Sequence, residues 1–282
     1  MTETPDQQER QNVAKAFGKV LNRHGYAFQY SVIKAIQGVT SQACWSPWTP
    51  EFPIEIQGHQ GRVDFLLVNR SGDRYLICEC KRANPALSHW CFARASFLPD
   101  SELSGRSFME TLERERNEIV CGTKILSQSD KIYQVALEVK TTESGDDSTK
   151  GRGQIEEAAT QVCRGLNGMI EFFYKRELLK QGKDWLAFLP VIFTTAKLWS
   201  SEVDLSSADL QRGEIDTSSL IVESRSWLWF QFHQSPGLKH PIRRRKVSYD
   251  MREILFNEFV RPVAIVTPAG IAEFLSSNIW SY

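Results

Sequence analysis

The sequence of 282 residues contains few residues of the kinds that build structural metal centres or disulfide frameworks. It has six cysteines and five histidines, and no two cysteines are separated by two residues, as they are in many zinc-binding pairs. A structural zinc site and a disulfide framework are therefore not expected, and a reducing, cytoplasmic environment fits best. Cys78 and Cys80 are expected to pack in the core as small apolar residues.

Long apolar runs and an excess of charge of either sign are also absent. No apolar run approaches the length needed to cross a membrane, and MTETPDQQERQ at the start lacks the apolar stretch of a signal peptide, so no membrane association is expected. The 34 basic and 34 acidic residues balance, so any surface that binds nucleic acid has to be local. No Gly-rich phosphate loop is present, and ATP-driven activity would have to come from a partner.

The most informative stretch is GRVDFLLVNRSGDRYLICECKRANP, residues 61–85. Residues 63–68 and 75–80 are rich in Val, Leu, Ile and aromatic residues, which is typical of strands, and the turn-forming residues 69–73 separate them. If the turn is centred between residues 71 and 72, antiparallel partners have numbers that sum to 143. The pattern therefore predicts a hairpin in which Asp64 faces Glu79.

Two carboxylates and an amine converge in this hairpin, because strand alternation places Lys81 on the same face as Glu79. Two carboxylates this close repel each other unless a cation lies between them, and oxygen ligands suit Mg²⁺ or Mn²⁺ better than zinc. The alternative is a solvent-facing strand with an ordinary Glu–Lys pair. Apolar residues on the same face, including Leu66 and Ile77, favour the buried site.

Asp64, followed after an apolar run by Glu79-Cys80-Lys81, resembles the PD-(D/E)XK or restriction-endonuclease-like nuclease superfamily, although Val63 stands where the family name has Pro. The resemblance implies an α/β fold with an αβββαβ core, in which helices flank a mixed central sheet, with insertions. It also implies that Asp64, Glu79 and the Cys80 carbonyl bind the metal and that Lys81 positions or activates the attacking water.

Glu51 and Glu55, near the expected first strand at residues 52–56, are candidates for a third metal-binding carboxylate. Glu55, which alternates with Ile54 and Ile56, is the preferred candidate for this third carboxylate, although a glutamate on an edge strand is often solvated. Gln154 and Gln161 share a face of a long helix expected after residue 153. Some branches of the superfamily carry a glutamine on this helix that points to the metal or substrate, so Gln161 is the preferred candidate. Two solvent-facing glutamines are the alternative.

Two further charged motifs need an interpretation. The dense basic cluster Arg243-Arg244-Arg245-Lys246 is a candidate for phosphate contacts, with a solvated loop as the alternative. A second E-x-K, Glu138-Val139-Lys140, follows another apolar run but has no strand aspartate about fifteen residues upstream. We interpret it as an additional strand with a surface charge pair, although it could neighbour the site and contribute a ligand.

The sequence predicts one nuclease-like domain, with a core at about 6–82 and 131–200, an insertion at about 83–130 and a C-terminal extension at about 201–282. The apolar periodicity predicts helices at 6–23 and 153–180, a buried strand within 185–199 and a strand, turn and closing helix at the end. METLERERNEIV in the insertion is helix-like in character. The aromatic run around Trp227, Trp229 and Phe230 is assigned to the core rather than to base stacking.

The expected function is that of a nuclease that hydrolyses phosphodiester bonds with Mg²⁺ or Mn²⁺. The family favours DNA over RNA and suggests restriction, repair or phage defence. The alternative is a catalytically inactive nuclease-like module that binds nucleic acid or a protein partner. Assembly as a homodimer or with partner subunits is left open.

Overall fold

The structure is a computed structural model, and it describes residues 5–39, 44–56, 58–95, 106–115, 118–128, 131–140, 153–176, 184–203, 205–238, 242–245 and 251–277. These residues form an α/β fold with a mixed sheet. The described part of the chain has five α-helices: α1 (Pro5–Arg23), α2 (Tyr26–Val39), α3 (Gln154–Lys175), α4 (Met251–Phe259) and α5 (Ile271–Leu275). None of the described helices is both long and apolar enough to cross a membrane.

The main sheet has nine strands. Its continuous path runs in the order β1 (Trp45–Ile56), β2 (His59–Asn69), β3 (Arg74–Lys81), β9 (Trp185–Thr194), β13 (Val260–Val266), β12 (Trp227–His233) and β7 (Ile132–Tyr133). β1, β2 and β3 form an antiparallel meander, whereas β3, β9 and β13 are parallel to one another. β5 (Arg106–Glu115) pairs with the first half of β9 and with β6 (Glu118–Gln128).

A second sheet of four strands lies beside the main one, in the order β11 (Val222–Arg225), β10 (Lys197–Ser201), β4 (His89–Ala93) and β8 (Val135–Val139). β10 follows β9 after a two-residue connection, so the central strand of the main sheet leads directly into the second sheet.

Helices cover both faces of the main sheet. The apolar stripe of α3 packs on one face, against residues such as Ile54, Leu66 and Ile77. α2 and α5 contribute to the core on the other face, with Ile36 and Phe274 among its buried residues. The near-continuous apolar sequence of β9 follows from this position, because a central strand between two helical layers is buried on both sides.

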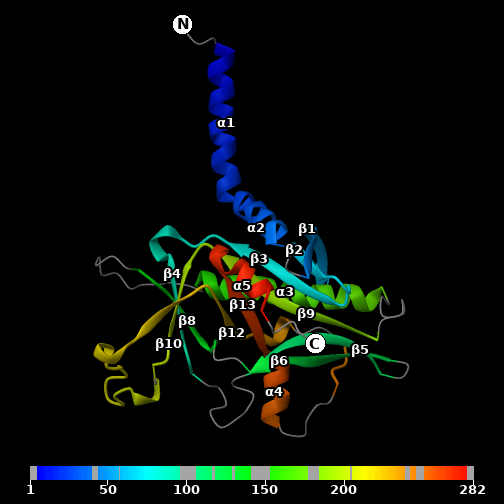
Figure 1. Cartoon of the computed structure of the whole chain (residues 1–282), viewed down its shortest axis with the longest axis vertical. Coiled ribbons are helices and arrows are strands. Elements are labelled where there is room, and N and C mark those ends of the chain that lie inside the picture. Colours follow the sequence, from blue (N-terminus) through cyan, green and yellow to red (C-terminus); the bar gives the residue numbers. More distant parts are fainter. Residues whose placement is uncertain are drawn as a thin grey trace.

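α1 differs from the other helices because it projects away from the body of the molecule, as Figure 1 shows. Its apolar residues Val13, Phe17 and Val20 occur at helical spacing, as predicted, but they are 61%, 62% and 49% exposed. The periodicity that identified the helix therefore does not face a core among the described residues.

Most of the predicted elements are present. The helices at the start and after residue 153 are confirmed, and so are the meander, the buried strand β9 and the closing strand, turn and helix. The predicted helix after residue 153 buries an apolar stripe: Ile155, Ala158, Ala159, Val162, Leu166, Met169, Ile170 and Phe173. Trp227, Trp229 and Phe230 lie in the core.

The helix-like interpretation of METLERERNEIV was wrong. The described residues of this run belong to β5 and β6, which pair antiparallel, and β5 belongs to the main sheet. The glutamates of this run make long-range ion pairs with Arg243, Arg244 and Arg245, which the local sequence does not show. α2 and α4 were not anticipated.

Candidate functional site

The β2–β3 hairpin has the register expected from the sequence. Phe65 pairs with Cys78 and Val68 with Tyr75, so each pair of residue numbers sums to 143. Beyond the last pair, the backbone N–H of Cys80 donates a hydrogen bond of 2.7 Å to Oδ2 of Asp64. This bond fixes the Asp64 carboxylate at the end of β3, beside Glu79.

Asp64 and Glu79 line a polar cavity of about 990 Å³. The cavity also brings together Lys81 and Gln161, two of the other predicted site residues. Further lining residues come from the α1–α2 junction, from β1 and from the segment after β3, and they include Arg23, His24, Gln29, Glu51, Arg82, Asn84 and Gln154. The cavity therefore lies where one end of the meander meets the first turns of α2 and α3.

The two carboxylates carry an electrostatic cost. Burial raises the pKa of Asp64 to about 6, against the lowering effect of the Cys80 N–H, and the nearby Glu51 raises it further. Burial and the charge of Asp64 raise the pKa of Glu79 to about 8. At neutral pH the ionised pair is therefore disfavoured by its own surroundings, and a cation between the two carboxylates would relieve this cost.

Lys81 is the amine nearest in sequence to the pair, and its charge lowers the pKa of both carboxyls. Its ammonium forms an ion pair of 3.1 Å with Glu157 of α3, and its side chain is only 18% exposed. Glu157 was not anticipated. The ion pair holds Lys81 at the wall of the cavity between β3 and α3.

Glu51 is the third carboxylate in the cavity. It lies between the pairs Pro50–Phe65 and Phe52–Val63 of the β1–β2 ladder, opposite Asp64. It is the only non-glycine residue with positive φ in the described chain, with φ of 51°. A residue with a side chain seldom adopts this conformation, and such strain is concentrated at functional sites. The irregular backbone turns the Glu51 side chain toward the cavity.

Gln29 of α2 holds this arrangement from the opposite side. Its Nε2 donates to Oε1 of Glu51 at 3.0 Å and to the backbone carbonyl of Asp64 at 2.7 Å. Gln29 is 4% exposed and shares the buried stripe of α2 with Val32 and Ile36. In the sequence, the signal that could have identified Gln29 was its position in line with the apolar residues Val32 and Ile36, because a glutamine on an apolar face needs hydrogen-bond partners.

The structure does not bring Glu55 to the cavity, so Glu51 takes the place that the sequence analysis gave to Glu55. Ile54 and Ile56 are buried and would touch a Cβ on Gly168 of α3. Alternation along β1 therefore directs Glu55 to the opposite face, where it is exposed and acts electrostatically on Lys175.

The two predicted glutamines both line the cavity. Gln161 is exposed on α3. Oε1 of Gln154 accepts a hydrogen bond of 2.7 Å from the backbone N–H of Asn84, which ties the segment after β3 to the first turn of α3. Of the two, Gln161 has the side chain free of a described hydrogen bond to the protein.

The basic cluster lies elsewhere and is neutralised by glutamates. Arg243 pairs with Glu118 at 2.9 Å, Arg244 with Glu110 at 2.5 Å, and Arg245 with Glu113 and Glu115 at 3.0 Å each. Backbone hydrogen bonds from Cys121 and Arg245 attach this segment to β6. The structure therefore gives these arginines partners within the protein rather than an open phosphate-binding surface. Lys246 lies outside the described residues.

The second E-x-K lies on β8 of the second sheet, as the predicted additional strand. Oε1 of Glu138 accepts a hydrogen bond of 3.0 Å from the backbone N–H of Ile155 in the first turn of α3. Neither Glu138 nor Lys140 lines the cavity. Glu138 therefore stabilises the N-terminus of the helix that forms one wall of the site.

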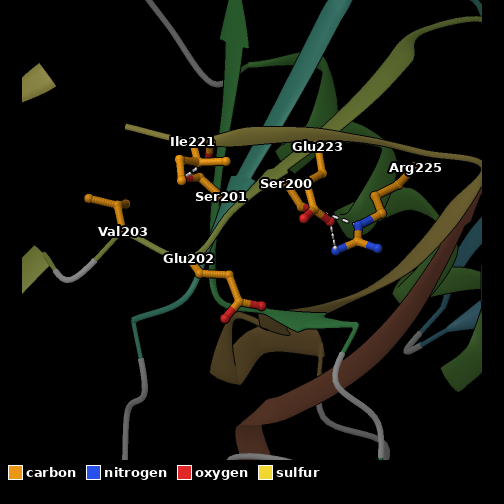
Figure 2. Close-up of a pocket in the computed structure, with 7 residues that line it drawn as sticks. All are labelled: Ser200, Ser201, Glu202, Val203, Ile221, Glu223 and Arg225. Carbon is orange, nitrogen blue, oxygen red and sulfur yellow. Dashed lines mark hydrogen bonds and ion pairs between the residues drawn. The ribbon is translucent and has the colours of Figure 1, made fainter. Parts of the chain in front are cut away.

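A smaller cavity of about 240 Å³ lies at the β10–β11 edge of the second sheet (Figure 2). Its charged residues are already paired: Nε of Arg225 donates to Oγ of Ser200 at 2.7 Å, and its guanidinium is 2.6 Å from Glu223. The pair of neighbouring half-buried carboxylates in the larger cavity has no counterpart there.

Among the described residues, no group of three or more His, Cys, Asp or Glu side chains has an arrangement that could by itself hold a metal ion. Comparison of the chain with family models, with curated proteins and with solved structures gave no match. The class of protein therefore has to be inferred from the fold and the cavity.

Proposed function

We propose that the protein is a metal-dependent phosphodiesterase of the PD-(D/E)XK class, and in particular a nuclease that acts on DNA in preference to RNA. The observation that carries this proposal is the pair of half-buried carboxylates, Asp64 and Glu79, with a lysine on the same strand as Glu79. The order α2, β1, β2, β3, α3, β9 and the parallel pairing of β3 with β9 also support it, because this is the αβββαβ order of the class.

The donor set fits Mg²⁺ or Mn²⁺ bound through few protein ligands. Mg²⁺ usually keeps several waters and takes one or two carboxylates together with substrate phosphates, so a preformed cage of three acidic side chains is not needed. Asp64, Glu79 and the carbonyl of Cys80 would hold the ion. When bound, such an ion polarises the phosphate and lowers the pKa of a bound water.

The remaining residues provide positioning and charge. Lys81, fixed by Glu157, is placed to orient the attacking water and to stabilise the negative charge that develops on the phosphate. Gln29 fixes Glu51 and the Asp64 backbone, and so keeps the acidic wall of the cavity in place. Gln161 lines the cavity, and its amide can donate a hydrogen bond to a substrate phosphate.

Cleavage of labelled nucleic acids tests the proposal. The purified chain is incubated with supercoiled, linear and single-stranded DNA and with RNA, each in Mg²⁺, Mn²⁺ or EDTA. We expect cleavage that requires the metal and that is lost in Asp64→Asn, Glu79→Gln and Lys81→Ala. Glu55→Gln is the matched control, because it removes a carboxylate of β1 that lies outside the cavity and should cut like the wild type.

Circular dichroism of each variant shows whether it is folded. If the wild type binds nucleic acid in every condition but never cuts it, the protein is a nuclease-like binding module instead. If folded Lys81→Ala protein cuts as fast as the wild type, the role assigned to Lys81 is wrong.

A further inference from the structure

α1 is an exposed helical arm that leads to the candidate active site. Its 19 residues span about 28 Å at 1.5 Å per residue, and Figure 1 shows it projecting from the sheet. Its last residue, Arg23, lines the cavity that contains Asp64 and Glu79. The arm and the cavity therefore share a continuous surface.

One face of the arm is basic. Lys15, Lys19 and Arg23 follow each other at intervals of four residues, so they form a stripe along the helix with a rise of about 6 Å per step. The other residues of this face are uncharged side chains that donate hydrogen bonds: Gln8, Gln11, Asn12 and Asn22. The two carboxylates of α1, Asp6 and Glu9, lie in its first two turns, and Asp6 is paired with Arg10.

The described part of the protein does not neutralise these cations. In the described chain no carboxylate forms an ion pair with Lys15, Lys19 or Arg23, whereas each of Arg243, Arg244 and Arg245 has a glutamate partner. Lys15, Lys19 and Arg23 are also exposed to solvent along the arm. The stripe is therefore available to a ligand of opposite charge.

The stripe continues into the cavity. A guanidinium nitrogen of Arg82 donates to the backbone carbonyl of Asn22, so the end of α1 is attached to the segment that follows Lys81. Arg23, Arg82 and Lys81 all line the cavity. Positive groups thus extend from the arm into the cavity that contains the carboxylates.

We propose that the basic face of α1 binds the phosphate backbone of the nucleic-acid strand whose scissile phosphate enters the Asp64–Glu79 cavity; this inference rests on the proposed nuclease function. A polyanion with regularly spaced phosphates matches a straight stripe of cations, and the interleaved amides can donate to phosphate and sugar oxygens. The arm provides affinity without reading the sequence, because backbone contacts carry no base information.

Binding of a short fluorescein-labelled DNA duplex to the full chain tests the proposal, by anisotropy in EDTA so that no metal-dependent cleavage occurs. The double variant Lys15→Gln/Lys19→Gln is expected to raise the Kd about tenfold near 0.1 M salt and to reduce the slope of log K against log salt by about 1.8, or ~0.9 per lost contact. Arg10→Gln is the control, because nine residues are two and a half turns and place Arg10 opposite Lys19.

The exposed residues Val13, Phe17 and Val20 on a neighbouring face define a competing outcome. If vesicles of phosphatidylcholine and phosphatidylserine bind the wild type through Lys15 and Lys19 while the duplex does not, the arm is a membrane-binding helix and the proposal is wrong. Equal duplex affinity of the double variant and Arg10→Gln, or no duplex binding by the wild type, also overturns it. Positions 10, 15 and 19 are all exposed, and glutamine is compatible with a helix, so loss of folding does not explain a difference between the two variants.

This experiment separates the inference from the proposed function. A wild type that binds DNA through Lys15 and Lys19 but never cuts it upholds the arm and refutes the nuclease. A wild type that cuts DNA while the double variant binds as tightly as Arg10→Gln upholds the nuclease and refutes the arm.

Discussion

Two charge clusters, one beside β5 and β6 and one at the Asp64–Glu79 cavity, differ in how far their groups are paired with opposite charges. In the first, the glutamates at 110, 113, 115 and 118 face the arginines at 243, 244, 245 and 261, so four negative and four positive charges cancel. In the second, the charges acting on Glu79 are those of three carboxylates and one amine. In the first cluster each charged group has an opposite partner, whereas carboxylates outnumber amines among the groups that act on Glu79.

The difference shows which buried charge indicates a site. Arg261 is 2% exposed, contacts Glu110 at 3.2 Å and donates to backbone carbonyls at the end of α4, so its role is to join β5, β13 and α4. Buried groups that are paired in this way stabilise a unique arrangement and need no ligand. Carboxylates whose neighbours are mostly carboxylates hold their protons to a higher pH, and such perturbed groups in a cavity are candidates for a functional site.

The largest effect is expected from Arg261→Met. It leaves Glu110 as a buried charge with one partner fewer, and the free energy of unfolding should fall by about 3–5 kcal/mol. Urea denaturation followed by circular dichroism measures the change. A triple variant with Met at positions 110, 244 and 261 should recover much of the loss, because no buried charge is left unpaired. A single variant as stable as the wild type would show that the cluster is not complete.

Glu79→Gln should have the opposite effect on stability. The substitution removes one of two carboxylates that destabilise each other, so the metal-free protein should unfold at the same or a higher urea concentration at about pH 8. Cleavage should fall by about 10²-fold or more, because the metal and the developing charge lose a ligand. If Glu79→Gln is destabilised like Arg261→Met, the carboxylate is part of a neutralised network and the comparison fails.

The pH dependence of stability follows from the same two groups. In the unfolded chain both carboxyls titrate near 4, but in the folded protein the pKa is about 6 for Asp64 and about 8 for Glu79. Between these values the folded state binds more protons than the unfolded state. The free energy of unfolding of the metal-free protein should therefore fall as the pH rises from about 4 to about 8.

Urea denaturation in EDTA at about pH 5 and about pH 8 measures this dependence. The double variant Asp64→Asn/Glu79→Gln should lose less stability over the same interval than the wild type. Mg²⁺ should restore the wild type at the higher pH and leave the double variant unchanged. Parallel pH profiles for the two proteins would show that the carboxylate pair does not carry the excess charge.

The hairpin and α3 could be predicted because their signals are local. The register of Asp64 and Glu79 follows from a turn between two adjacent strands, and the buried stripe of α3 follows from its periodicity. β5 could not be predicted as a strand, because the partner that allows Glu110 to be buried is 134 residues away at Arg244. A glutamate in an amphipathic run is typical of a helix until that distant partner is known.

The site could be predicted in part for the same reason. Asp64, Glu79 and Lys81 belong to one hairpin, and Gln161 belongs to a helix with a clear face. Glu51 lines the cavity with a positive φ of its own, an irregularity that the alternation along β1 does not predict. Glu55 was preferred for this reason. Arg243, Arg244 and Arg245 look like a phosphate-binding surface in the sequence because their glutamate partners are more than a hundred residues away.

The smallest effect is expected at the second E-x-K, and it provides a matched comparison with the first. Glu138 accepts a hydrogen bond from the first turn of α3, where a negative charge also interacts favourably with the helix dipole. Glu138→Gln keeps an acceptor and removes the charge, so the free energy of unfolding should fall by about 0.5 kcal/mol. Neither Glu138→Gln nor Lys140→Gln should alter cleavage, because neither side chain lines the cavity.

The same Glu→Gln change at Glu79 should abolish cleavage without lowering stability. The same substitution is thus made in both E-x-K motifs. It distinguishes Glu138, whose carboxylate accepts a hydrogen bond from a backbone N–H, from Glu79, whose carboxylate lies near other carboxylates. If folded Glu138→Gln protein loses as much cleavage as Glu79→Gln, Glu138 acts on the site through α3, and neutralisation within the chain is not sufficient to assign a buried carboxylate to structure.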